Sequence, residues 1–218
     1  MKTKVKICCI SSIEEAQTAI KFGASALGLV AKMPSGPGVI SDEEIRKIAN
    51  SIPPPIASFL LTSETDTRQI TQHQKSVGTN TIQIVDELKS GSYEEISLAL
   101  PGIKIVQVIH VNGNESIELA ISISKHVDAI LLDSGNPNLQ IKELGGTGRQ
   151  HDWNISKKIR DSVSIPIFLA GGLNAENVKQ AIQTVKPFGV DVCSGVRTNG
   201  KLDPIKLERF FHAVHSSN

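Results

Sequence analysis

The chain has 218 residues, of which 39% are hydrophobic and 21% are charged, so it can bury a sizeable core and is not typical of a disordered protein. Its 23 Lys and Arg nearly balance its 22 Asp and Glu, and no basic stripe or acidic tail occurs, so we expect no nucleic-acid partner and no membrane partner. No apolar run would span a membrane, no signal peptide opens the chain, and three cysteines make no disulfide framework, which predicts a cytoplasmic protein. We expect a monomer or a homodimer.

Short runs rich in Val, Ile and Leu alternate eight times with longer stretches of helical period. The pattern predicts strands at 4–9, 25–30, 56–61, 81–85, 103–111, 127–132, 165–170 and 188–193. It predicts helices at 12–22, 41–51, 64–77, 90–99, 114–125, 151–161, 174–185 and 203–216. Residues typical of helix N-termini open three of these stretches: Ser41 with Glu44, Asn174 with Asn177, and Asp203 before Pro204.

Eight strand–helix units in a chain of this length predict an α/β fold, the (β/α)8 TIM barrel, as one domain over residues 1–218. An open doubly wound sheet is the alternative. It is disfavoured because no glycine-rich nucleotide-binding motif follows any strand and because the number of units is high. In a barrel the active site lies at the carboxyl ends of the strands, so polar residues at those ends are the candidates.

The first strand carries a cysteine that we consider a candidate catalytic residue. Alternation along the strand places Val5, Ile7 and Cys9 on the side facing the helices, and Lys6 and Cys8 on the side facing into the barrel. A buried cysteine often serves only as a small apolar side chain. Near a cation, however, a thiol ionises more easily and becomes a base or a nucleophile.

The sixth strand ends in Asp133, and a carboxylate at the catalytic end of an apolar strand must be hydrogen-bonded or take part in the chemistry. Asp128, at the other end of this strand, fits a turn or cap. A long loop follows, in which Gly146 belongs to a glycine-rich segment able to approach an anion.

Glycines also follow the last two strands, where barrels of this kind often bind phosphate. Backbone N–H groups are accessible around Gly171 and Gly172 after the seventh strand, and around Ser194 and Gly195 after the eighth. His110 ends the fifth strand and is a candidate for lining the mouth of the barrel. The histidines show no metal-ligand spacing, so we expect no metal.

The segments VKICCIS, LLDS followed by GGTGRQHDW, FLAGGLNAENV and PFGVDVCSGVR resemble the phosphoribosylanthranilate isomerase family of tryptophan biosynthesis, in order and over nearly the whole chain. The resemblance implies a (β/α)8 barrel and an Amadori rearrangement of a phosphorylated aminosugar, with no cofactor. It assigns the general acid to Asp133 and the general base to Cys8. It also implies that the two glycine loops bind phosphate and that further residues contact substrate: Lys6, Gln83, His110 and Asp191.

The chain departs from the family motifs around the aromatic half of the expected substrate. Cys9 replaces the usual glycine, Pro37 stands where an arginine is usual, Val85 where a histidine is usual, and Arg197 where a glutamate is usual. Strand 3 ends in Leu-Thr instead of Val-Asn. Two alternatives therefore stay open: a barrel enzyme for a different phosphorylated aminosugar, and a non-catalytic protein that binds a phosphorylated ligand.

Overall fold

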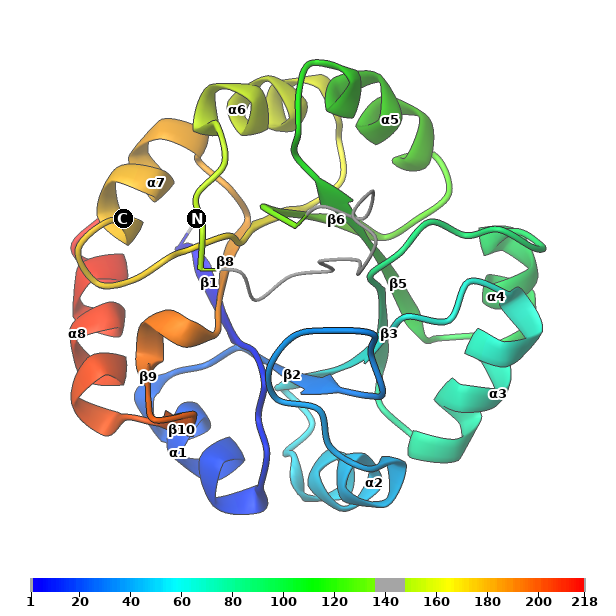
Figure 1. Ribbon diagram of the computed structural model, residues 1–218, viewed down its shortest axis with the longest axis horizontal. Coiled ribbons are helices and arrows are strands. Elements are labelled where there is room, and N and C mark those ends of the chain that lie inside the picture. Colours follow the sequence, from blue (N-terminus) through cyan, green and yellow to red (C-terminus); the bar gives the residue numbers. More distant parts are fainter. Residues whose placement is uncertain (1, 136–147, 218) are drawn as a thin grey trace.

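The computed structural model describes residues 2–135 and 148–217. Within these residues eight parallel strands close into a barrel in sequence order, and helices surround it (Figure 1). The strands are β1 (Lys4–Ile7), β2 (Ala26–Val30), β3 (Ala57–Thr62), β4 (Thr81–Ile84), β5 (Lys104–His110), β6 (Ala129–Asp133), β7 (Ile167–Leu169) and β8 (Gly189–Val192). The predicted barrel is therefore confirmed.

The α-helices follow the strands in turn. They are α1 (Ile13–Phe22), α2 (Asp42–Ser51), α3 (Thr67–Val77), α4 (Tyr93–Ala99), α5 (Glu115–Ile123), α6 (Trp153–Ser162), α7 (Val178–Val185) and α8 (Pro204–His215). A 3-10 turn, η1 (Ser194–Val196), follows β8 and leads into the short strands β9 (Arg197–Thr198) and β10 (Lys201–Leu202), a hairpin that the sequence pattern did not predict. Among the described residues, no helix is both long and apolar enough to cross a bilayer.

Two apolar layers hold the barrel together. Side chains that alternate outward, such as Val5, Ile7 and Ile109, pack against the helices in the larger core. Side chains that alternate inward, such as Val106 and Val108, fill the barrel itself. Parallel strands buried on both faces explain why these segments read as nearly continuous apolar runs.

Two local predictions were wrong. Helix α7 begins at Val178 instead of residue 174, because the Asn174 side chain accepts hydrogen bonds from the N–H groups of Glu176 and Asn177 and closes a separate turn. Cys9 does not face the helices, since β1 ends at Ile7 and Cys9 adopts a left-handed φ of 62°. That backbone conformation interrupts the alternation and places Cys9 in the inner cluster.

Candidate active site

A cleft opens at the carboxyl ends of the strands, with about 700 Å³ of atom-free space that includes open solvent. It brings together residues that lie far apart in the sequence. Among the described residues, seven of the site residues proposed from the sequence line this cleft: Cys8, Gln83, Asp133, Gly171, Gly172, Asp191 and Ser194. Gly146 lies outside the described residues.

A buried ion pair between Lys6 and Asp191 lies beside the cleft. Lys6 of β1 is opposite Asp191 of β8 in the register that closes the barrel, and its Nζ lies 2.9 Å from Asp191 Oδ2. Burial alone would lower the pKa of Lys6, but the Asp191 carboxylate, assisted by Cys8, outweighs it and raises the pKa to about 12. Burial raises the pKa of Asp191, Lys6 opposes this, and the Asp133 carboxylate adds to it. Lys6 is therefore charged at neutral pH.

The Lys6 ammonium and the Cys8 thiol both lie against Gly28 of β2. A Cβ atom at Gly28 would be 3.0 Å from Lys6 Nζ and 2.9 Å from Cys8 Sγ, so only glycine leaves room for both groups. Sequence reasoning missed this position, because a glycine inside a strand does not reveal which side chains pass over it. The missing side chain at Gly28 thus places the Lys6 cation on the same side of β2 as the Cys8 sulfur.

Asp133 lies at the end of β6 and is 8% exposed. Its Oδ1 accepts a hydrogen bond of 2.7 Å from the N–H of Ser134. His151, nearby, has its pKa lowered by burial, with the Asp133 carboxylate opposing. The His151 imidazole near the Asp133 carboxyl group is therefore neutral at neutral pH.

Two acceptor atoms at the cleft are buried and have no hydrogen-bond partner in the part of the chain that the structure describes. They are Gln83 Oε1 and Asp191 Oδ1, and both residues line the cleft. An unpaired buried acceptor is costly, so such atoms mark places where a ligand hydroxyl or N–H would be accepted.

Three loops meet where the sequence predicted a phosphate site. Gly171 and Gly172 have left-handed φ values of 85° and 63°. A Cβ at Gly172 would lie 2.7 Å from the carbonyl oxygen of Gly148, and one at Gly148 would lie 3.8 Å from Ser194 Oγ. The loops after β6, β7 and β8 thus converge, and Gly195 lies behind them, pressed against the Leu173 carbonyl rather than lining the cleft.

The structure does not bring His110 to this cleft. Its Nε2 lies 3.1 Å from the carbonyl oxygen of Val85, and its ring lines a separate cavity with Tyr93 and Asn112. Position at a strand end did not reveal the direction in which the ring turns. Among the described residues, no cluster of His, Cys, Asp or Glu could hold a metal ion.

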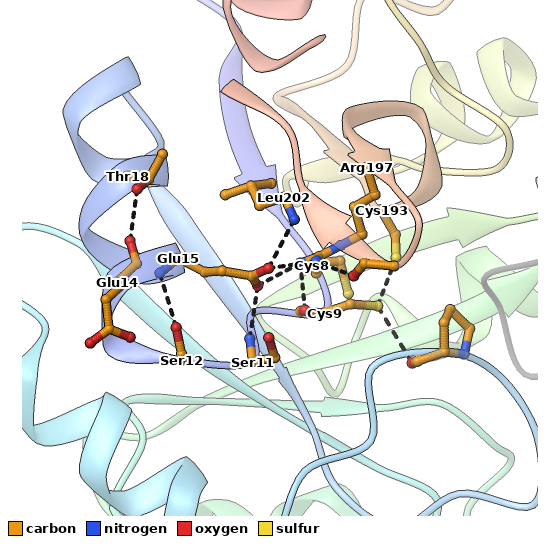
Figure 2. Close-up of polar contacts among 12 residues, drawn as sticks. Cys8, Cys9, Ser11, Ser12, Glu14, Glu15, Thr18, Cys193, Arg197 and Leu202 are labelled. Atoms are coloured by element: carbon orange, nitrogen blue, oxygen red, sulfur yellow. Dashed lines mark hydrogen bonds and ion pairs between the residues drawn. The ribbon is translucent and has the colours of Figure 1, made fainter. Parts of the chain in front are cut away.

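Several residues that the sequence did not single out as site residues lie around Cys8 (Figure 2). The Arg197 guanidinium, just after η1, donates hydrogen bonds to the carbonyl oxygens of Cys8 and Cys9 and forms an ion pair with Glu15 of α1. Cys9 Sγ lies 2.7 Å from Cys193 Sγ. No local pattern could predict these contacts, because they join segments more than 180 positions apart.

The side of the cleft formed by the loop after β2 lacks a cation among the described residues. Met33, Ser35, Gly36 and Pro37 line it, and no Lys or Arg side chain of the described ranges does so. Lys32 is exposed beside this loop, and its carbonyl oxygen accepts a hydrogen bond from Ser63.

Comparisons with known proteins identify the family of this chain. The family described as N-(5'phosphoribosyl)anthranilate (PRA) isomerase matches residues 5–213. An N-(5'-phosphoribosyl)anthranilate isomerase from Methanothrix thermoacetophila is 36% identical, over 98% of this chain and 99% of the relative. The crystal structure of phosphoribosyl anthranilate isomerase from Thermotoga maritima has a TM-score of 0.80 at 30% identity, covering 98% of this chain and 99% of that one.

A second solved structure of this isomerase holds reduced 1-(o-carboxyphenylamino)-1-deoxyribulose 5-phosphate. It has a TM-score of 0.78 at 28% identity and covers 98% of this chain and 99% of its own. The family match and the relative in Methanothrix each extend over nearly the whole chain. The chain therefore belongs to the N-(5'-phosphoribosyl)anthranilate isomerase family.

Proposed function

We propose that this chain catalyses the Amadori rearrangement of N-(5-phosphoribosyl)anthranilate to the 1-deoxyribulose 5-phosphate aminoketose. The observation that carries the proposal is that Cys8, just after β1, and Asp133, at the end of β6, line one cleft although β1 and β6 are not neighbouring strands. The glycine loops after β7 and β8 line the same cleft. An acid, a base and a phosphate site are the groups that this reaction requires.

Asp133 is the proposed general acid. In its protonated form it would give a proton to the ring oxygen of the sugar, which opens the ring to a Schiff base. Cys8, on the other side of the opened sugar, would remove the proton from C2 as a thiolate and produce an enolamine, which then tautomerises to the ketone. Lys6 keeps a positive charge beside the Cys8 sulfur during this step.

The remaining polar groups are proposed to orient the substrate. The unpaired oxygens of Gln83 and Asp191 would accept hydrogen bonds from sugar hydroxyls or the substrate N–H. The backbone around Gly171, Gly172 and Ser194 would bind the 5-phosphate. We propose that a single-domain barrel holds the site, as a monomer or as a homodimer.

The test is an assay of the purified chain on phosphoribosylanthranilate, together with growth rescue of a tryptophan auxotroph that lacks this isomerase. Cys8→Ala and Asp133→Asn are each expected to lower kcat by at least about 100-fold, the usual effect of losing a positioned base or acid. Asp128→Asn is the matched control, because this carboxylate lies at the opposite end of β6 and pairs with Lys104 on the surface. Near wild-type turnover in both active-site variants would refute the assigned mechanism.

A further inference from the structure

All three cysteines of the chain meet at one place in the cleft. Cys8 and Cys9 follow β1, Cys193 follows β8, and each of them lines the cleft as a free thiol. The left-handed φ of Cys9 is what turns its side chain inward. In Figure 2 the Cys9 and Cys193 side chains point toward one another, and their sulfurs are 2.7 Å apart. The proposed rearrangement uses neither of these two thiols.

We propose that Cys9 and Cys193 form an oxidation site, at which a peroxide converts the two thiols into a disulfide between the end of β1 and the end of β8. Cys193 sulfur attacks one peroxide oxygen and becomes a sulfenic acid, and the other oxygen leaves as water. Cys9 sulfur then attacks Cys193 sulfur, and the sulfenic oxygen leaves as a second water. The two thiols are oxidised and one hydrogen peroxide is reduced, so atoms and electrons balance.

The surroundings distinguish the roles of the two sulfurs. Cys193 is partly exposed, whereas Cys9 is 5% exposed, so a peroxide in the cleft reaches Cys193 more easily. The hydrogen bond with Cys9 lowers the pKa of Cys193 against the effects of burial and of the Asp191 carboxylate, and Arg197 and Lys6 lower it further. The pKa of Cys9 is raised well above its usual value by the hydrogen bonds with Cys193 and Cys8 and by burial. Cys193 is thus the attacking thiolate, and Cys9 resolves the sulfenic acid.

The position of the bridge predicts its effect. Cys9 adjoins the proposed base Cys8, and Cys193 adjoins Ser194 of the phosphate-binding loops. A disulfide draws the sulfurs from 2.7 Å to about 2.0 Å and joins the two loops covalently. If the proposed function is correct, oxidation lowers turnover at least about 10-fold, because displacing a catalytic or substrate-positioning group by about 1 Å can cost that much. A reductant then restores turnover. The formation of the disulfide itself does not depend on that function.

Mass spectrometry of the purified chain, treated with hydrogen peroxide, alkylated and digested with trypsin, tests the bridge directly. Trypsin should release residues 7–21, which contain Cys8 and Cys9, linked to residues 180–197, which contain Cys193. The linked peptides are expected in the wild type and in Cys8→Ser, and are expected to be absent from Cys9→Ser and from Cys193→Ser. Cys8→Ser keeps both Cys9 and Cys193, so it should still yield the linked peptides. The result therefore does not rest on the absence of a link in variants that fold poorly.

Two outcomes would overturn the proposal: the wild type yields Cys193 sulfinic acid with no linked peptide, or Cys9→Ser still yields a link, which would then involve Cys8. Activity is measured in parallel, each variant relative to its own reduced form. A bridge that forms without a reversible loss of turnover would refute the effect on catalysis. Linked peptides from a chain inactive on phosphoribosylanthranilate would refute the proposed function and leave the oxidation site standing.

Discussion

Arg197 and Glu15 form a bidentate ion pair across the barrel closure, with Nη1–Oε1 at 2.9 Å and Nη2–Oε2 at 3.0 Å. The same guanidinium donates to the carbonyl oxygens of Cys8 and Cys9, so it holds the turn that carries the proposed base. Glu15 also accepts hydrogen bonds from two backbone N–H groups, those of Ser11 and Leu202. The family motif has a glutamate at the position of Arg197. In this chain the carboxylate that pairs with the Arg197 guanidinium comes from Glu15 of α1.

Removing this guanidinium should affect both stability and catalysis. Arg197→Met leaves the Glu15 carboxylate without its cation, and the expected loss of unfolding free energy is about 3 kcal/mol. We also expect kcat to fall, because the turn bearing Cys8 loses its hydrogen-bond donor. Denaturant unfolding and steady-state kinetics measure the two effects, and Arg209→Met, on the exposed face of α8, is the control. A variant that loses less than about 1 kcal/mol and keeps its kcat would contradict this role.

The same pair predicts an acid dependence of stability. Burial opposes ionisation of Glu15, but hydrogen bonds from Arg197 and the Leu202 N–H outweigh it, so its pKa is lowered from 4.5. A lowered folded-state pKa gives stability that is present above pH 4.5 and lost as the pH falls through the folded-state value. Glu15→Gln should therefore lose less stability than the wild type when unfolding is compared at pH 6 and at about pH 3. If the wild type and Glu15→Gln lose the same unfolding free energy between these two pH values, Glu15 does not contribute to the acid dependence of stability.

The Lys6–Asp191 pair separates stability from catalysis. Lys6→Met leaves a buried carboxylate unpaired and should cost about 3–5 kcal/mol of unfolding free energy. Lys6→Met combined with Asp191→Leu removes both charges, which is often close to neutral, so most of the stability should return. Turnover should stay at least about 100-fold below the wild type in both variants, because the charge beside Cys8 is absent. Wild-type kcat in the stable double variant would make the pair purely structural.

A negative charge at the convergence of the three loops should weaken binding of the phosphorylated substrate. Ser194 is exposed and lines the cleft, so Ser194→Asp alters the local charge without filling the core. We expect KM to rise at least about 10-fold, since like charges in a partly desolvated site repel. Ser194→Ala, which adds no charge, should change KM little. A crystal soaked in phosphate should hold the anion between Gly172 and Ser194, and an anion bound only elsewhere would contradict the assignment.

We place the anthranilate half of the substrate against Met33, Ser35 and Pro37, and no Lys or Arg side chain of the described ranges lines the cleft there, which predicts weakened activity on this substrate. A buried carboxylate requires a charged donor, and arginine meets it with two hydrogen bonds. Pro37 lines the cleft and has an ordinary negative φ, so Pro37→Arg is compatible with the backbone. We expect KM to fall about 10-fold or more, the value of one charge-assisted hydrogen bond. Pro34→Arg is the control, because Pro34 is in the same loop but does not line the cleft. Equal KM values in the wild type, Pro37→Arg and Pro34→Arg would show that another group binds the carboxylate.

The eightfold alternation of strands and helices was predictable from the sequence, because apolar periodicity is a local property that each segment carries by itself. It identified the barrel, and the barrel identified the strand ends where Asp133 and the glycine loops lie. It also placed Lys6 on the inner face of β1, where the structure has it paired with Asp191. These inferences needed only the period of a strand and the side of the barrel on which sites occur.

What the tertiary structure alone decided concerns contacts between distant segments. The φ of Cys9 reversed the direction that alternation assigned to it, and the ring of His110 lines a separate cavity and contacts the Val85 carbonyl. The contacts of Cys193 with Cys9 and of Arg197 with Glu15 depend on how β1 and β8 align when the barrel closes. Such contacts are determined by strand register and by the backbone geometry of single turns, and neither property is encoded in the apolar period of one segment.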